Sequence, residues 1–271
     1  MLEYVTNILA PTPSKTFADL TFGFGGHSKK LLEYGCTVQA FDRDPNTKAE
    51  AAKLSNLNSN FSFVLSKFST IYDHLSVCDG ILIDLGVSSM QLDQPERGFS
   101  FSKNGPLSMT MGLNSLSARD IVNSWKENDI ADLLYFYGDE RASRLIAKNI
   151  VKERNNKQIT TTTELANIVS KSKKHNKKIH PATQSFQAIR MYVNDELNEI
   201  VNAMNIATRK LKQGGRLAII TFHSIEDKLV KVFFKNSGFI LKKPQPIFAS
   251  HQEVEKNIRS RSAKLRWGIK I

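Results

Sequence analysis

Cysteine is scarce in this chain, with only Cys36 and Cys78 among 271 residues. Each lies inside or beside an apolar run, so we expect two buried thiols in a reducing compartment and neither a disulfide nor a zinc site. Long apolar runs are lacking as well, since no stretch approaches the roughly 18 residues of a membrane-spanning helix. The first residues, Met1 to Tyr4, do not show the basic and then apolar pattern of a secretory signal. We therefore expect a cytoplasmic protein with no membrane segment.

Acidic residues are too few to balance the basic ones. The net charge is +12, and the excess is localised, because residues 141–178 carry +9 and residues 256–270 carry +6. A localised basic excess on a chain that is otherwise slightly acidic is typical of proteins that bind a polyanion. We interpret the partner as nucleic acid; a solvated, lysine-rich surface is the alternative.

The rest of the composition is that of a globular protein, with 41% hydrophobic and 24% charged residues. Strand-like apolar runs at 17–20, 37–41, 61–65 and 80–85 alternate with helix-like segments. This alternation predicts an α/β fold with a mostly parallel sheet and helices on both faces. Residues 1–15, which include two prolines, are expected to form a loose lead-in.

A glycine-rich turn follows the first strand-like run, and the second run stops at Asp42. This order predicts the opening β-α-β unit of an open sheet, with the turn and the acid together at the carboxyl ends of two strands. Glycines at 25 and 26 let the backbone approach a ligand closely. The third glycine of the dinucleotide motif is replaced by Ser28, which disfavours NAD or FAD. A nucleoside ligand without a pyrophosphate fits better, and S-adenosylmethionine is the commonest one on this architecture.

The alternation stops after residue 85. Residues 88–112 show no sustained period and predict a long functional loop. Helix signals follow, among them the capping box Thr161-Thr-Thr-Glu164. We therefore predict a sheet domain formed by residues 1–105 and 182–271, interrupted by a small helical insert at residues 106–181.

The segment after the insert returns to the pattern of the sheet domain. Apolar residues spaced by three and four predict one long amphipathic helix over residues 183–211. A buried strand is expected at 216–222, and Ser224 is expected to cap the helix that follows it. Residues 239–243 and 263–269 predict an antiparallel hairpin at the edge of the sheet.

A series of short peptides now resembles one family. It includes Thr21-Phe-Gly-Phe-Gly-Gly-His-Ser28, Asp42-Arg-Asp-Pro45, Asp79-Gly-Ile-Leu-Ile-Asp-Leu-Gly-Val-Ser-Ser89 and Phe222-His-Ser-Ile-Glu-Asp-Lys228, with residues 91–93, 97–101, 105–107, 180–183, 186–190, 193–194, 196–197 and 259–266. In this order the peptides resemble the MraW/RsmH family. That family comprises bacterial-type methyltransferases that place a methyl group on N4 of a cytidine in the decoding region of 16S ribosomal RNA.

The resemblance implies a class I S-adenosylmethionine-dependent methyltransferase fold, Rossmann-like, with the helical insert as its substrate-recognition domain. It implies S-adenosyl-L-methionine as the cofactor and 16S ribosomal RNA, or the small ribosomal subunit, as the partner. Asp42 would bind the ribose and Phe68 would lie beside the adenine, although Phe68 taken alone is typical of a core residue. The cofactor-binding residues implied by the motifs are Gly25, Gly26, His27, Asp42, Phe68, Asp84 and Gln91.

The implied reaction is a displacement at the sulfonium methyl by the exocyclic amine of cytosine. Because the lone pair of that amine is delocalised into the ring, the enzyme must align it with the methyl and accept its hydrogens. We predict Asp84 and His223 as the catalytic groups, and no metal. Helix N-capping is the alternative role of Asp84, and capping by Ser224 and Asp227 is the alternative explanation of half of residues 222–227. A covalent carbon-5 methyltransferase would need a nucleophilic cysteine in the cleft. Cys78 precedes its strand and is expected at the opposite end of the sheet.

RNA binding is assigned to the helical insert and the basic C-terminal segment. Phe99 and Phe101 are candidates for a stacking wall against the unstacked target base, with core packing as an equal alternative. Cations spaced by three and four give one basic helix face suited to phosphates, which further lysines extend. The predicted phosphate contacts are Arg141, Arg144, Lys148, Lys152, Lys173 and Lys174.

Two segments depart from the family pattern. Ser108-Met-Thr-Met111 stands where the family usually has Asp-Met-Arg-Met, and Gln184 stands where an arginine is common. The joint loss of an acid and a base is compatible with a coupled pair that was replaced together, and also with reduced activity. The alternative function is therefore a catalytically weakened ribosome-assembly or RNA-binding factor on the same fold. A small-molecule methyltransferase would not explain the basic segments, and the oligomeric state, a homodimer included, stays open.

Overall fold

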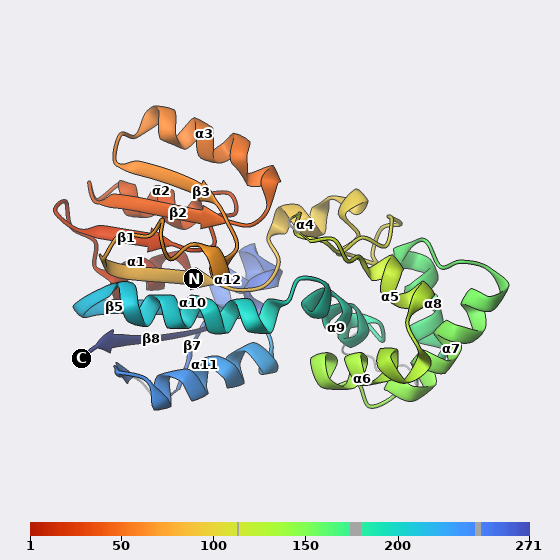
Figure 1. Cartoon of the computed structure of the whole chain (residues 1–271). Helices are drawn as coiled ribbons and strands as arrows, with labels where there is room; N and C mark the ends of the chain where they lie inside the picture. The colour runs from red at the N-terminus through yellow and green to blue at the C-terminus, as the bar shows by residue number, and fades with distance from the viewer. Residues whose placement is uncertain (113, 174–179, 242–244) are drawn as a thin grey trace. The chain divides into compact units, whose positions relative to one another are not determined.

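The computed structural model of the chain describes residues 1–112, 114–173, 180–241 and 245–271. The chain divides into two compact units (Figure 1). The first unit combines Met1–Gly86 with Leu197–Ile271, and the second is Val87–Glu196.

A single sheet forms the centre of the first unit. Its strands lie in the order β3-β2-β1-β4-β5-β8-β6, and β7 pairs with β8. The first five strands of this order are parallel, whereas β8 runs antiparallel to β5, β6 and β7. The mostly parallel sheet and the antiparallel edge pair are both confirmed. The strands are β1 (Thr16–Asp19), β2 (Thr37–Asp42), β3 (Phe61–Leu65), β4 (Cys78–Asp84), β5 (Leu211–Thr221), β6 (Phe239–Leu241), β7 (Ile247–Phe248) and β8 (Lys264–Lys270).

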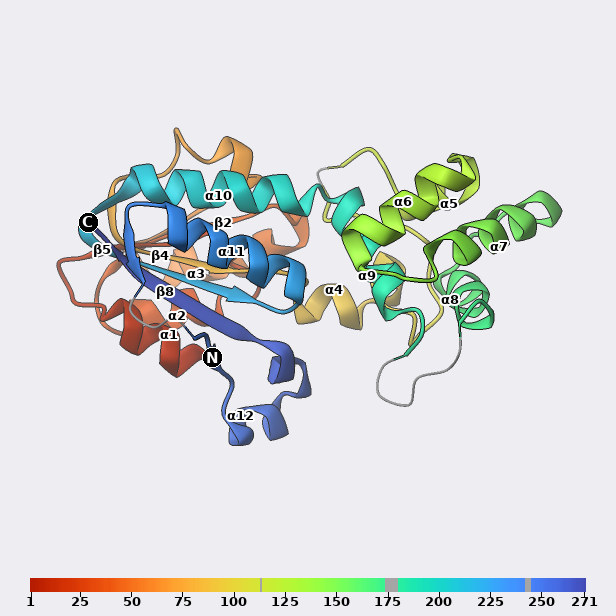
Figure 2. The same ribbon diagram turned by 90° about the horizontal axis from the view of Figure 1, so that it is seen from below.

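Helices cover both faces of this sheet, and the strands are buried on both sides. In β4, Ile81 and Ile83 join one apolar cluster with residues of α10 and α11, while Leu82 joins a second cluster with residues of α1, α2 and α3. This alternation follows from the two-residue period of a strand. Figure 2 shows α10 and α1 on opposite sides of the strands. The helices are α1 (Leu2–Leu9), α2 (Gly26–Leu32), α3 (Lys48–Leu57), α10 (Glu196–Lys210), α11 (Ser224–Asn236) and α12 (His251–Lys256), with the 3-10 turns η1 (Pro45–Thr47), η2 (Phe68–Thr70) and η4 (Ile258–Ser262).

The predicted loose lead-in is wrong, because α1 occupies most of it. Val5, Ile8 and Leu9 lie on one side of this helix and are buried in the second cluster. Ala10 ends the helix in a left-handed conformation with φ of 47°, before the two prolines. The prolines therefore follow the helix and do not prevent it.

The second unit is built from helices around its own apolar core. The predicted insert, residues 106–181, lies inside this unit, which extends beyond both of its predicted ends. The capping box at Thr161 and Glu164 is confirmed at the start of α8. Part of the segment expected to be an irregular loop forms α4. The helices are α4 (Ser89–Asp93), α5 (Ala118–Ser124), α6 (Glu127–Gly138), α7 (Ser143–Asn156), α8 (Thr162–Lys171) and α9 (Thr183–Val193), with the 3-10 turn η3 (Pro95–Arg97).

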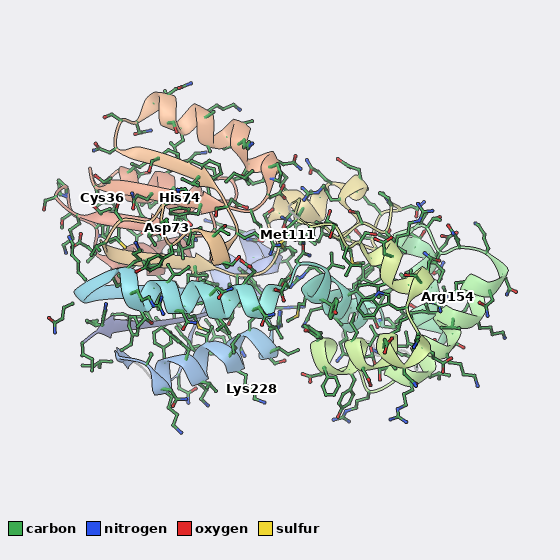
Figure 3. All side chains as sticks on the ribbon, in the orientation of Figure 1. Cys36, Asp73, His74, Met111, Arg154 and Lys228 are labelled. Atoms are coloured by element: carbon green, nitrogen blue, oxygen red, sulfur yellow. The ribbon has the colours of Figure 1, made fainter. Side chains whose placement is uncertain are left out.

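The single long helix predicted over residues 183–211 is wrong, because the chain breaks between α9 and α10. Asp195 is left-handed at the break, with φ of 49°. The fully buried Asn194 donates to the carbonyl of Met109 at 2.8 Å and accepts from the backbone N–H of Met111 at 2.8 Å (Figure 3 labels Met111). The side chain of Asn194 is therefore bonded to a distant loop at the point where the helix ends. The apolar period persists across the break, so the pattern alone did not reveal it.

Candidate functional site

The glycine turn between β1 and α2 leaves free space at the start of a helix. Gly25 has φ of 74°, and a β-carbon on it would lie 2.7 Å from the ring of Phe22. Gly26 is the first residue of α2, and apart from its chain neighbours and the backbone of α2 no atom of the described residues lies within 4 Å of where its β-carbon would be. The backbone at Gly25 therefore has a left-handed conformation that favours glycine. The N-terminus of α2 faces the free space beside Gly26.

Asp19, the last residue of β1, forms hydrogen bonds to the segment that contains the glycine turn. It is not among the residues predicted from the sequence. Its carboxylate accepts hydrogen bonds from Ser28 Oγ at 2.7 Å and from the backbone N–H of Thr21 at 3.1 Å. Asp19 is completely buried, and this burial raises its pKa. An acidic residue at the end of an apolar strand, the pattern that also marks Asp84, could have identified Asp19 as a candidate site residue.

Asp42, at the end of β2, lies directly against the glycine turn. Its Oδ2 accepts a hydrogen bond from the backbone N–H of Gly23 at 2.8 Å, and its Oδ1 accepts one from the backbone N–H of Asp44 at 2.9 Å. Burial raises the pKa of Asp42 to about 6, although both hydrogen bonds favour the ionised form. Each carboxylate oxygen can accept a further hydrogen bond, so the side chain can still bind hydroxyl groups of a ligand.

Asp84 ends β4 and faces His27 from α2. The two side chains approach to 3.7 Å between His27 Nε2 and Asp84 Oδ2, and the backbone N–H of Asp84 donates to Thr21 Oγ1 at 2.7 Å. Burial alone would lower the pKa of His27, but the contact with Asp84 and the charge of Asp19 outweigh it, so the pKa is raised. His27 Nδ1 and Asp84 Oδ1 are buried and have no hydrogen-bond partner among the described residues. Two polar atoms thus remain for a ligand in the same place.

Phe68 and Gln91 lie in different units. Phe68 opens η2 after β3 and is half-buried against the core of the first unit, where α10 holds the turn through a 3.1 Å bond from the Ser69 backbone N–H to Glu199. Gln91 belongs to the second unit, where it accepts from the Ser88 backbone N–H at 3.0 Å and completes the capping box of α4. Phe68 therefore belongs to the same unit as the glycine turn, and Gln91 belongs to the other unit.

His223 follows β5 and is the N-cap of α11, so the prediction that Ser224 caps this helix is wrong. His223 Nδ1 accepts a hydrogen bond from the backbone N–H of Glu226 at 3.4 Å, and His223 Nε2 lies 3.0 Å from Glu226 Oε1. The side chain of Glu226 is fully buried and accepts from the Phe222 backbone N–H at 2.8 Å. His223 Nδ1 therefore caps the helix, whereas the buried Nε2 makes no hydrogen bond among the described residues although it lies close to Glu226. Asp227 is paired with Arg266 at 2.8 Å and Lys264 at 3.3 Å.

The predicted phosphate contacts on and just before α7 are exposed, as a phosphate-binding face requires, but Lys173 is not. Lys173 Nζ contacts Glu140 Oε2 at 2.5 Å and donates to Gln184 Oε1 at 3.2 Å. Lys174 lies outside the described residues. The exposed residues are Arg141, just before α7, and Arg144, Lys148 and Lys152 on it.

Phe99 and Phe101 pack inside the second unit. Phe99 is buried in its core, and Phe101 stacks on His180 with ring centroids 4.5 Å apart. The core-packing alternative therefore accounts for both rings. At the departure from the family pattern, Ser108 Oγ and Thr110 Oγ1 lie 3.0 Å apart. This contact agrees with a coupled pair that was replaced together.

S-adenosylmethionine fits the residues around the glycine turn. The turn offers free space beside Gly26, Asp42 offers acceptors, and His27 with Asp84 offers two buried polar atoms without partners in the described part of the chain. The described part of the chain contains no group of three or more histidine, cysteine, aspartate or glutamate residues that could hold a metal ion. Within the same ranges, no helix is long and apolar enough to cross a membrane.

Comparison with known proteins gives a match over the whole chain. A sequence model of the MraW methylase family matches residues 1–271. Ribosomal RNA small subunit methyltransferase H of Agrobacterium fabrum is 43% identical over 294 residues, covering 100% of this chain and 86% of that protein. The protein of the same name from Rickettsia bellii is 42% identical over 299 residues, covering 100% and 97%. Among solved structures, an rRNA methylase from Streptococcus thermophilus has a TM-score of 0.48 at 12% identity, covering 100% of this chain and 93% of its own.

Proposed function

The chain belongs to the MraW methylase family, and from this premise we propose that it methylates N4 of a cytidine in the decoding region of 16S ribosomal RNA. The observation that carries the proposal is the whole-chain match to relatives named ribosomal RNA small subunit methyltransferase H, at 42–43% identity. S-adenosyl-L-methionine is the methyl donor of this family, as the sequence predicts.

The residues around the glycine turn would hold the donor. Gly25 and Gly26 leave room for it at the start of α2, and Asp42 would accept hydrogen bonds from its ribose hydroxyls. His27 and Phe68 complete the proposed contacts in the first unit. Bound there, the donor supplies an electrophilic methyl group on its sulfonium.

Asp84 is the proposed acceptor for hydrogens of the cytosine amine. Its Oδ1 is buried without a partner among the described residues, while Oδ2 faces His27. The hydrogen bond from the Asp84 backbone N–H to Thr21 fixes the end of β4, so the carboxylate is positioned before substrate arrives. Because His223 Nδ1 caps the helix, we now assign His223 to positioning the start of α11.

Nucleophilic catalysis by cysteine finds no support at this end of the sheet. Cys78 is the first residue of β4 and Asp84 is the last, so the thiol lies at the amino end of the strand. Burial raises the pKa of Cys78 to about 12, which disfavours a thiolate. Direct transfer to nitrogen is therefore preferred to a covalent carbon-5 reaction.

The second unit is proposed to recognise RNA. The exposed cations along α7 form one face of that helix and suit phosphate groups. Since phosphate contacts position and do not read sequence, base selection would depend on the site around Asp84.

Transfer of a labelled methyl group, followed by nucleoside digestion, tests this function. The chain is incubated with labelled donor and either 16S RNA or isolated small subunits, and N4-methylcytidine is the expected product. Asp84→Asn should lower the rate by about 100-fold or more, because the amine loses its anionic acceptor. Asp73→Asn, at an exposed position before β4 (Figure 3), should leave the rate unchanged.

The same experiment identifies the alternative. A chain that binds the donor and RNA but transfers no methyl would be a catalytically weakened assembly factor. A different methylated nucleoside would contradict the assignment of N4 of cytidine.

A further inference from the structure

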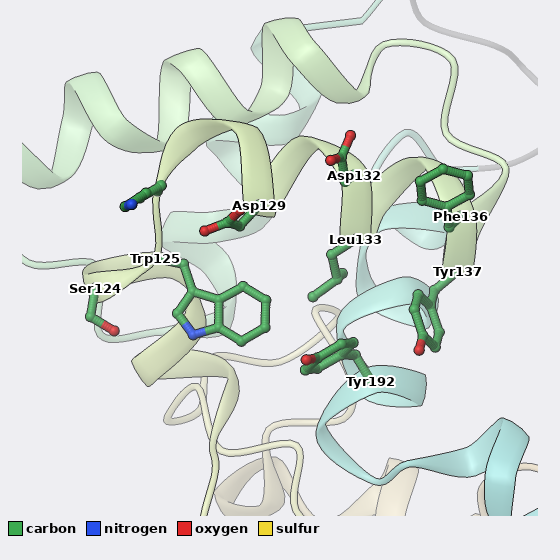
Figure 4. Close-up of a pocket in the computed structure, with 9 residues that line it drawn as sticks. Ser124, Trp125, Asp129, Asp132, Leu133, Phe136, Tyr137 and Tyr192 are labelled. Atoms are coloured by element: carbon green, nitrogen blue, oxygen red, sulfur yellow. The ribbon is translucent and has the colours of Figure 1, made fainter.

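The proposed reaction does not use a cavity of about 630 Å³ in the second unit (Figure 4). One face of α6 supplies most of its lining, including Asp129, Asp132 and Tyr137. Trp125, which follows α5, and Tyr192, on α9, complete it. All of these residues belong to one compact unit, so the cavity is a property of that unit by itself.

Aromatic rings form the floor of this cavity. Trp125 and Tyr192 meet edge to face with ring centroids 5.0 Å apart, and Tyr137 meets Tyr192 at 5.3 Å. Figure 4 shows Tyr192 between the other two rings. All three side chains are only half-buried, so they still present ring surface to the cavity. The negative face of an aromatic ring attracts a cation that is stripped of part of its water.

Carboxylates lie beside these rings. In Figure 4, Asp129 and Asp132 lie on the same side of the row of rings. Both are exposed, and within the described part of the chain neither forms an ion pair. Lys126 is the one cation of the lining. The cavity therefore has aromatic surface and an excess of negative charge.

The charge of α6 contrasts with that of the rest of the protein. From Glu127 to Gly138 the helix carries three acids and no lysine or arginine, on a chain of net charge +12. The neighbouring α7 carries the basic face described above. Carboxylates at the cavity repel the phosphates of a nucleic acid and attract a cation, so the two helices suit partners of opposite charge.

We propose that this cavity binds an arginine side chain from a basic segment of a partner protein. A guanidinium group is planar, stacks on aromatic rings and pairs with carboxylates through two parallel hydrogen bonds. The rings of Trp125 and Tyr192 would receive its face, and Asp129 and Asp132 would receive its N–H groups. This site is independent of the methyl-transfer site and of the proposed RNA substrate.

The fluorescence of Trp125 offers a direct measurement. The chain has two tryptophans, so the Trp267→Phe variant leaves Trp125 as the only indole. Titration with the peptide acetyl-(Arg-Gly)4-amide should change this fluorescence to saturation. The same peptide with citrulline in place of arginine is neutral but similar in shape, and should bind about tenfold more weakly or less.

Matched variants separate the cavity from general electrostatics. In the Trp267→Phe background, combined Asp129→Asn and Asp132→Asn substitutions should lower the affinity for the arginine peptide about tenfold or more. Glu127→Gln removes one acid from the same helix outside the cavity lining, and should change the affinity less than twofold. All substituted acids are exposed, so the fold should be retained.

Several results would overturn the proposal. Equal binding of the citrulline peptide, or no saturable change with either peptide, would exclude a guanidinium site. A saturable change in Trp125 fluorescence with a cytidine-rich RNA oligonucleotide, and none with the arginine peptide, would assign the cavity to nucleobases. Self-association that the double variant abolishes, measured by sedimentation, would assign it to a second copy of this chain.

Discussion

His27 Nε2 lies 3.7 Å from Asp84 Oδ2, and this side-chain contact links α2 to the end of β4. The buried Asp19 adds a second negative charge to the surroundings of the imidazole. This arrangement places an imidazole with a raised pKa beside the carboxylate that we propose as the hydrogen acceptor. It also makes the stability of the first unit depend on the protonation of His27.

His27→Gln should lower stability most at acidic pH. The pKa of His27 is raised in the folded state above its ordinary value of 6.5. Its contribution to stability is therefore fully present below pH 6.5 and is lost as the pH rises through the folded pKa. Denaturant unfolding of both proteins from pH 5.5 to 9 should show a free-energy difference that shrinks with rising pH. His251→Gln, at a side chain that is 89% exposed, should change the unfolding free energy little at any pH; a constant difference for His27→Gln would contradict the pairing.

Donor binding should weaken as the pH falls through about 6. The pKa of Asp42 is raised to about 6 by burial, and a ribose that donates hydrogen bonds favours the ionised carboxylate. If the ionised form alone binds, the affinity for S-adenosylmethionine at pH 5 is about tenfold below that at pH 7.5. Calorimetry across this range measures the change. Asp42→Asn should bind weakly at every pH and lose this dependence; an unchanged profile would exclude Asp42 from the contact.

Alanine at the two neighbouring glycines should separate folding from binding. Gly25→Ala forces a side chain into a left-handed backbone and against Phe22, and should cost about 1–3 kcal/mol of unfolding free energy. Gly26→Ala adds a methyl group where, apart from its chain neighbours and the backbone of α2, no atom of the described residues lies within 4 Å, and should change stability by less than about 0.5 kcal/mol. The affinity of Gly26→Ala for S-adenosylmethionine should nevertheless fall, because the methyl group fills the donor's space. Unchanged affinity would place the donor elsewhere.

Removing the cations of α7 should weaken RNA binding and reduce its salt dependence. For Arg144→Ala, Lys148→Ala and Lys152→Ala together, the slope of log affinity against log salt should fall by about 2 to 3. Fluorescence anisotropy with a 16S RNA fragment at several salt concentrations measures this.

The matched control lies on α11, where Lys228, Lys231 and Lys235 are exposed on one helix at spacings of three and four (Figure 3 labels Lys228). Their combined replacement by alanine removes the same charge from the first unit. An equal loss in the control would mean that net charge, and not the α7 face, accounts for binding.

Much of the first unit could be predicted because its strands are buried on both faces. Residues 61–65 were predicted as a strand and form β3 with the same bounds, and Asp42 and Asp84 end strands as the apolar runs indicate. The helix expected over residues 183–211 could not be corrected from the pattern, since apolar residues keep their period through Asn194 and Asp195. The break depends on the Met109–Met111 loop, which lies more than 80 positions away in the sequence.

The parallel sheet and the glycine turn against Asp42 follow from local spacing and strand ends, because parallel strands bring their carboxyl ends to one edge. The family follows from the resemblance of the motif peptides. The partners of polar groups became known only from the three-dimensional arrangement: His223 lies against Glu226, Lys173 contacts Glu140, and Asn194 bonds to a distant loop at the end of a helix. It also brought Trp125, Asp129 and Tyr192 around one cavity, from three helical segments whose separate periods indicate only buried and exposed faces. Residues that are paired or that line one cavity come from separate segments of the chain, and tertiary packing brings them together.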